Sequence, residues 1–209
     1  MVGSDEFFDE KIIDMINKSE QKVTNSETNR SEEVGEKRSI YNGIKILGKW
    51  IYFERRPLAE ETITMMLPEN FGKMDLDIAK KKYPSEQRPE TILTDETGTI
   101  NLMFQYMEGE VDDATIESFR NQIFGMMKRV NQGIKEREIG VVDVSGKKIA
   151  YVEFSNPTID GKLYNFMFYL VVRGKPLMGS FNCQTKEMKY WRPITFEMIQ
   201  SIEIVESDE

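Results

Sequence analysis

The sequence predicts an α+β domain of the α/β/α sandwich type, in which helices cover both faces of a mostly antiparallel sheet. First, Leu163–Val172 is apolar at both odd and even positions, although alternate side chains of a strand point to opposite faces. Such a strand is typical of a sheet centre that is covered on both sides. Second, short apolar segments follow one another through tight turns. Third, one long amphipathic helix interrupts them. We therefore expect one long helix on one face and shorter helices on the other.

The first 39 residues differ in composition from the rest of the chain. Ser4 is expected to cap a short helix whose apolar stripe contains Phe8, Ile12 and Ile16. Residues 17–39 are rich in polar side chains and predict a flexible linker. We therefore divide the chain into this helix with its linker, residues 1–39, and a domain, residues 40–209. The stripe can dock on its own domain, on a second copy as a homodimer, or on another protein.

The first half of the domain is expected to contain four strands and a short helix. Asp75 or Asp77 begins the helix, and Tyr83 ends it because the residue before a proline avoids helical angles. In order, the expected elements are strand Ile44–Glu54, a connection Arg55–Leu58, strand Glu61–Leu67, turn Pro68–Gly72, the helix, and strands near 91–94 and 99–107.

The second half is expected to contain the long helix, four strands and a closing helix. The long helix begins at Asp112, Asp113 or Thr115 and ends at Gly133, with apolar residues at helical spacing from Ile116 to Val130. Pro193 is expected in the first turn of the closing helix, where its missing N–H is no loss. The four strands, joined by hairpin connections, are Ile134–Val144, Lys147–Ser155, Leu163–Val172 and Pro176–Cys183.

The residue types present exclude several kinds of active site. The chain has no histidine, which removes Ser-His and Cys-His dyads and histidine metal clusters. Its one cysteine, Cys183, excludes an internal disulfide and a thiolate zinc site. Paired carboxylates such as Asp112–Asp113 stand at turns or helix starts, where they cap backbone N–H groups. We therefore predict no catalytic residues, no metal site and no cofactor, and only carboxylate or lysine chemistry stays open.

The overall charge bears on partners and location. The formal net charge is −8, which disfavours a nucleic-acid partner because phosphate backbones are also negative. No apolar window is long enough to span a bilayer, and acids interrupt the apolar residues near the N-terminus. We expect a cytoplasmic protein, although the sequence leaves open a leader or lipid anchor that has been removed.

Several short motifs resemble the PsbP/DcrB-like superfamily, which also includes the Mog-type Ran-binding factor. Leu67–Phe71 resembles the turn after that family's first hairpin, and Lys82–Pro84 with Arg88–Pro89 resembles its short helix and proline turn. Phe181–Cys183, with Trp191 downstream, resembles its last strand and closing helix. The resemblance covers residues 44 to 204, and residues 1–39 have no counterpart in it. It implies a non-enzymatic scaffold, because relatives serve as photosystem subunits, GTPase-binding factors, envelope lipoproteins and chaperone-adaptors.

Alternation along the strands separates two faces of the sheet. One face is aromatic and aliphatic, with Phe104, Phe166 and Phe168, and we expect the long helix to cover it. The other is softer, and flexible thioethers adapt to varied apolar partners, so we predict a groove for a peptide or helix there. The alternative is that the short and closing helices cover this second face. The candidate groove residues are Met103, Met107, Met167, Tyr169 and Met178.

Together these observations predict a non-enzymatic, bacterial-type interaction protein, an adaptor or chaperone-like module that binds an apolar segment of a protein partner. The alternatives are a structural subunit of a surface or secretion assembly, and a hydrolase that relies on carboxylates and lysine. An open apolar trough would favour the binding module. Convergent buried carboxylates in a pocket would favour the enzyme.

Overall fold

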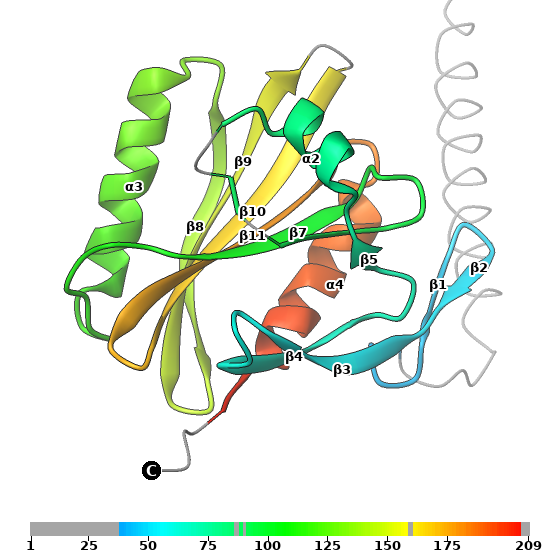
Figure 1. Cartoon of the computed structure of the whole chain (residues 1–209), viewed down its shortest axis with the longest axis horizontal. Helices are drawn as coiled ribbons and strands as arrows, with labels where there is room; N and C mark the ends of the chain where they lie inside the picture. Colours follow the sequence, from blue (N-terminus) through cyan, green and yellow to red (C-terminus); the bar gives the residue numbers. More distant parts are fainter. Residues whose placement is uncertain (1–37, 86–87, 90, 159–160, 206–209) are drawn as a thin grey trace, which may run out of the picture. The chain divides into compact units, whose positions relative to one another are not determined.

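The computed structural model describes residues 38–85, 88–89, 91–158 and 161–205 (Figure 1). The chain divides into two units between Arg38 and Ser39, and nearly all the described residues belong to the second. The expected N-terminal helix, with Phe8, Ile12 and Ile16, and most of the linker lie outside the described residues.

A seven-stranded antiparallel sheet is the centre of the domain, and β10 lies inside it as the apolar run predicts (Figure 1). β10 pairs with β9 on one side and with β11 on the other. In spatial order the strands are β5 (Gly72–Lys73), β6 (Ile92–Thr94), β7 (Asn101–Tyr106), β11 (Lys175–Gln184), β10 (Gly161–Val172), β9 (Lys147–Thr158) and β8 (Lys135–Val144).

Two smaller sheets complete the strand inventory of the described residues. A three-stranded sheet has the order β12 (Glu203–Ile204), β4 (Ile63–Pro68) and β3 (Phe53–Leu58). A two-stranded hairpin consists of β1 (Ile44–Ile46) and β2 (Lys49–Ile51).

The first predicted strand is wrong in two respects. The segment Ile44–Glu54 is interrupted by a turn at Leu47 and Gly48, both with positive φ, which separates β1 from β2. In addition, Arg55–Leu58 is part of β3, and the true connection to β4 is Ala59–Thr62. Both errors have one cause, because these turns place leucine, alanine and glutamate in left-handed conformations that usually favour glycine or asparagine.

Three α-helices lie within the described residues. α2 (Leu76–Lys82) begins after Asp75, whose carboxylate accepts hydrogen bonds from the N–H groups of Asp77 and Ile78. α3 (Ile116–Val130) is the predicted long helix. α4 (Met188–Gln200) begins before the predicted start, so Pro193 lies inside it rather than in its first turn. The earlier start lets Trp191 pack between Phe71 and Phe181 in the core.

The register of the strands confirms the predicted division into two faces. Met103, Ser180 and Met167 lie opposite one another across β7, β11 and β10 and therefore share a face. Phe104, Gly179 and Phe168 form the neighbouring row, which points to the other face.

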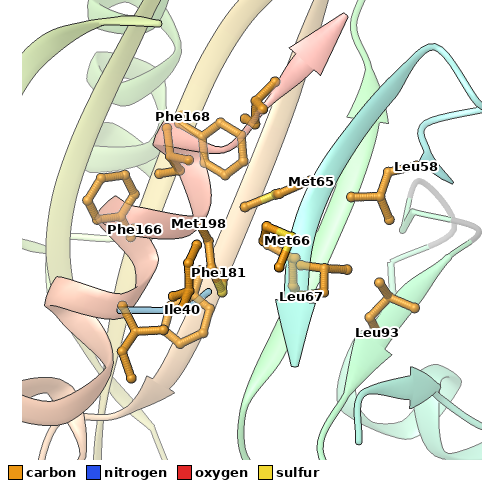
Figure 2. Close-up of a cluster of buried hydrophobic side chains, with 14 of the residues drawn as sticks. Ile40, Leu58, Met65, Met66, Leu67, Leu93, Phe166, Phe168, Phe181 and Met198 are labelled. Carbon is orange, nitrogen blue, oxygen red and sulfur yellow. The ribbon is translucent and has the colours of Figure 1, made fainter. Parts of the chain in front are cut away.

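The helices cover these faces in the opposite way from our expectation. The aromatic face packs against α4 and β4, and Figure 2 shows Phe166, Phe181 and Met198 together in this cluster. The softer face packs against α3, through Ile116 and Phe124. The exchange has a packing reason, because the aromatic face carries the larger cluster of buried side chains, and α4 and the three-stranded sheet pack against it together. The fold class itself, α+β with a mostly antiparallel sheet, is confirmed.

Candidate functional site

A cavity of about 510 Å³ opens beside the β3–β4 connection. It lies between this connection, the segment around Pro89, and strands β6, β7 and β11. Its volume is within the range of pockets that hold small ligands or side chains of a partner. The lining residues are Arg56, Pro57, Leu58, Ala59, Glu60, Glu61, Arg88, Pro89, Thr91, Leu93, Phe104, Gln105, Tyr106 and Leu177.

The floor of the cavity is apolar. Leu58, Leu93 and Leu177 are buried there, and they come from three different strands. Figure 2 shows Leu58 and Leu93 at one end of the hydrophobic cluster. The ring of Phe104 is half-buried and meets Phe168 edge-on, with 5.8 Å between ring centroids. The floor is therefore continuous with the main core, and packing against the core fixes the shape of the floor.

One wall of the cavity is a strained turn. Ala59, Glu60 and Glu61 have φ of 50°, 58° and 62°, so three successive residues with side chains are left-handed. The turn is closed by Thr62, whose N–H and hydroxyl both donate to the carbonyl of Ala59, at 3.2 and 2.6 Å. The Thr62 hydroxyl also shares a hydrogen bond with the hydroxyl of Tyr106. Backbone strain of this kind clusters at functional sites, where it fixes the position of a loop.

Charged side chains at the cavity have different roles. The guanidinium of Arg56 donates to the carbonyls of Phe71, Pro68 and Glu69 and pairs with Glu54, so it fastens the wall. Glu60 and Glu61, by contrast, are exposed. Arg88 stands on the other side, with one hydrogen bond of 2.9 Å to the carbonyl of Ser85. The site thus has an apolar floor and a rim that carries both signs of charge.

A second polar cluster lies on the α4 face, outside the cavity lining. Glu153 is fully buried and accepts hydrogen bonds from the Arg192 guanidinium, both at 2.7 Å, and from the Tyr164 hydroxyl, also at 2.7 Å. Arg192 bridges to Glu138 at 2.6 Å, and Glu138 also accepts from Tyr151. Each of these side chains has a partner, so the cluster fastens α4 to β8, β9 and β10.

Burial and hydrogen bonding change how this cluster titrates. Burial, together with the hydrogen bond to Glu138, raises the pKa of Tyr151 to about 12. Burial and Glu153 raise the pKa of Tyr164 further in the same direction. Hydrogen bonds to Glu153 raise the pKa of Arg192, which stays charged. These groups therefore hold their protons at neutral pH.

The predicted binding residues lie in buried clusters rather than along an open groove. Met167 and Tyr169 are buried under α3, and Met107 and Met178 are partly buried beside them. Met103 lies in a separate cluster with Met74 and Ala79, near α2. In the described part of the chain, then, the methionine face is covered. A partner-binding role for these residues stays a prediction, and it would require α3, and for Met103 also α2, to leave the sheet.

The structure also bears on the single cysteine, on metal sites and on membrane-spanning helices. Cys183 is buried in β11, and burial raises the pKa of its thiol to about 12, so a nucleophilic thiolate is not available at neutral pH. Among the described residues, no group of three or more Cys, Asp or Glu side chains is arranged to hold a metal ion. Within the same residues, no helix has both the length and the apolar composition needed to cross a membrane.

The sequence does not predict the cavity, although several of its residues stand in predicted elements. Glu61 was expected to begin a strand and Arg88–Pro89 to form a proline turn. Their convergence depends on β3, β6 and β7 meeting in space, and the only local signal is the density of proline and charge at 56–61 and 88–89.

Comparison with known proteins supports the fold. No protein-family model matches the chain, and no curated protein matches it either. It is similar to PsbP from Synechocystis sp. PCC 6803, with a TM-score of 0.55 and 12% identity over 73% of this chain and 92% of that one. It is also similar to LpqN of Mycobacterium tuberculosis, which is involved in cell envelope biogenesis, with a TM-score of 0.50 and 12% identity over 74% of this chain and 92% of that one. The chain therefore has the PsbP-like fold, which confirms the predicted resemblance at the level of the fold.

Proposed function

We propose that this protein is a non-enzymatic interaction module that binds an apolar segment of a protein partner, in an adaptor or chaperone-like role. The observation that carries the proposal is the cavity with its apolar floor and charged rim. Folds of this kind host many functions, so the argument rests on the site and not on the likeness to PsbP or LpqN.

The shape and chemistry of the cavity fit an extended peptide better than a reacting group. Leu58, Leu93 and Phe104 offer an apolar seat for one or two side chains. The rim acids Glu60 and Glu61 lie where they meet a basic residue beside that apolar anchor. A buried seat with a polar rim is the usual anatomy of a protein interface.

The same geometry weighs against the hydrolase alternative. A general acid needs a carboxyl group whose pKa is raised by burial. The cavity's own carboxylates, on Glu60 and Glu61, are exposed at the rim. The buried carboxylate, Glu153, lies outside the lining and is held by Arg192.

The proposal is tested by selecting peptides from a phage-displayed random library on the whole protein. We expect selected peptides to share an apolar anchor with a neighbouring Lys or Arg. Thr91→Trp adds a large ring at the exposed mouth of the cavity and should weaken binding at least about tenfold. Thr158→Trp, which places the same ring at an exposed site at the end of β9, is the matched control and should bind normally.

A second pair of variants tests the rim. Glu60→Lys with Glu61→Lys should weaken the binding of basic peptides several-fold, because the charges at the mouth of the cavity are reversed. Glu108→Lys with Glu110→Lys makes the same change of net charge at exposed positions outside the lining. Equal effects of the two pairs, or binding that survives Thr91→Trp, would contradict the cavity as the binding site.

A further inference from the structure

The β1–β2 hairpin has an apolar inner face and an outer face of a different chemistry. Ile44 lies opposite Ile51, and both pack into the core together with Ile46. On the outer face, Lys45 lies opposite Trp50. Because side chains alternate along a strand, Tyr52 lies on the same side as Trp50. The hairpin is therefore anchored from within and presents aromatic and basic side chains outward.

The outward side chains are unusually exposed for their size. Leu47, at the hairpin turn, is 77% exposed, Tyr41 is 64%, Trp50 is 54% and Tyr52 is 52%. The rings of Trp50 and Tyr52 are nearly parallel, at 13°, with centroids 6.1 Å apart. Figure 1 shows the turn of the hairpin pointing away from the seven-stranded sheet. Several exposed large apolar side chains gathered on one hairpin indicate a contact site.

The leucine at the turn is a costly choice for folding. Leu47 and Gly48 have φ of 48° and 84°, which suits Asn-Gly far better than leucine-glycine. Burial does not offset this strain, since the side chain of Leu47 is largely exposed. Its position at the turn is therefore better explained by a contact outside the domain.

The charge of the hairpin is opposite to that of the protein. Residues 38–53 contain Arg38, Lys45 and Lys49 and no carboxylate, whereas the whole chain has a net charge of −8. One carboxylate meets the segment at its base, away from the turn: Glu197 accepts a hydrogen bond from the N–H of Ile40.

We infer that this hairpin docks on the surface of an anionic lipid bilayer. Trp and Tyr side chains favour the headgroup region, where one end is apolar and the other is wet. Lys45 lies beside them, and Lys49 is exposed near the turn, opposite Ile46. Both lysines are attracted to anionic lipids, and the exposed leucine at the turn enters the acyl boundary. The turn of the hairpin points away from the sheet, whereas sites for small ligands are concave, so a soft, deformable partner fits it best. The inference is independent of the cavity and of its proposed peptide partner.

The test uses the whole protein with vesicles of phosphatidylglycerol and phosphatidylcholine, compared with phosphatidylcholine alone. We expect binding in dilute salt to the anionic vesicles only, and loss of binding in concentrated salt because the charges are screened. Lipids brominated on the acyl chain should quench Trp50. Trp191 is only 4% exposed, so it reports little quenching in the native protein.

Matched variants locate the contact. Lys45→Glu with Lys49→Glu should lower the partition coefficient by at least about twentyfold, since each lysine at an anionic surface contributes about fivefold. Lys162→Glu with Lys175→Glu makes the same charge change at exposed sites outside the hairpin and should have little effect. Asparagine suits the left-handed turn, so Leu47→Asn should fold well, and it should bind the vesicles several-fold more weakly. Leu76→Asn, which changes another exposed leucine, should leave vesicle binding unchanged.

Several outcomes would overturn the inference. They are a lack of binding to anionic vesicles in dilute salt, equal losses in both lysine pairs, and binding without quenching of Trp50. Light scattering without lipid measures self-association and gives a further outcome that would overturn the inference. Self-association that disappears in Trp50→Thr would assign the hairpin to a second copy of the chain instead.

Discussion

Each face of the seven-stranded sheet receives one arginine from the helix that covers it, and the two arginines are satisfied differently. On the α4 face, Arg192 forms a two-bond ion pair with the buried Glu153 and a further bond with Glu138. On the α3 face, Arg120 is only 3% exposed and donates to the carbonyls of Gly140 and Tyr151, at 2.6 and 3.0 Å. Arg192 thus has carboxylate partners, whereas the hydrogen-bond partners of Arg120 are uncharged carbonyl oxygens.

The contrast extends to the tyrosines. The hydroxyls of Tyr151 and Tyr164, on the α4 face, both donate to carboxylates. The hydroxyl of Tyr169, on the α3 face, is buried and has no hydrogen-bond partner among the described residues. The α4 face thus buries a carboxylate whose hydrogen-bond partners are all in place, whereas the α3 face buries a cation held by carbonyl oxygens and leaves one hydroxyl unpaired.

The largest expected effect comes from breaking the network on the α4 face. Arg192→Met leaves the buried Glu153 without its cation and should lower the free energy of unfolding by about 3–5 kcal/mol. Urea unfolding followed by circular dichroism measures it. Adding Glu153→Gln removes the unpaired charge and should restore part of the loss, and a failure to restore any would show that the arginine acts by packing alone.

Two glycines on the α4 face give the next effect. Gly179 and Gly140 each lie opposite an aromatic residue, Phe168 and Tyr151 respectively. A Cβ at Gly179 would meet the Phe168 ring at 2.0 Å in the centre of the sheet, whereas at Gly140 it would meet Tyr151 at 2.4 Å near the edge. Gly179→Ala should therefore cost about 1–3 kcal/mol of stability and Gly140→Ala less, because Gly140 stands on the edge strand β8, whose backbone can shift. Equal melting temperatures for the two variants would refute this ordering.

Alkaline pH probes the tyrosines of both faces together. Burial raises the pKa of Tyr164 and Tyr169, and burial with Glu138 raises that of Tyr151 to about 12. Since the unfolded chain releases these protons near pH 10 and the folded chain keeps them, stability should fall as the pH rises above about 10. The slope is at most about 1.4 kcal/mol per pH unit for each tyrosine. Tyrosinate absorbance should appear together with unfolding, and ionisation well before unfolding would contradict the burial argument.

The unpaired hydroxyl on the α3 face gives an effect of opposite sign. Tyr169→Phe removes a buried polar group that lacks a partner and keeps the edge-on contact with Phe119, so it should raise stability by about 1 kcal/mol. Tyr164→Phe, by contrast, removes a hydrogen bond to Glu153 and should lower stability. Denaturant midpoints that move in the same direction would refute the difference between the faces.

The smallest effect is expected for the arginine of the α3 face. Arg120→Met removes a buried cation whose partners are carbonyl oxygens, and it leaves no carboxylate unpaired. Its cost should stay within about 1 kcal/mol, because an apolar side chain of similar length fills the same space. A loss as large as that of Arg192→Met would mean that the dipoles hold Arg120 as firmly as the carboxylates hold Arg192.

Individual elements show how far local patterns reach. Leu163–Val172 predicted a central strand because apolar residues stand at both parities, and β10 is that strand. Asp75 and the apolar spacing of Ile116 to Val130 predicted α2 and α3 because capping and helical periodicity are local. The β1–β2 turn at Leu47 escaped prediction because its residues are atypical for the conformation they adopt.

The sequence by itself determined the fold class, the order of most elements and which strand residues share a face, because alternation, capping and turn chemistry act between near neighbours in the chain. Only the tertiary structure decided which helix covers which face, and it placed α3, and α2 at Met103, over the predicted methionine groove. It also assembled the cavity at Leu58, Leu93 and Phe104 and paired Glu153 with Arg192. These features depend on how volumes fill space and how distant charges meet, which no short stretch of sequence specifies.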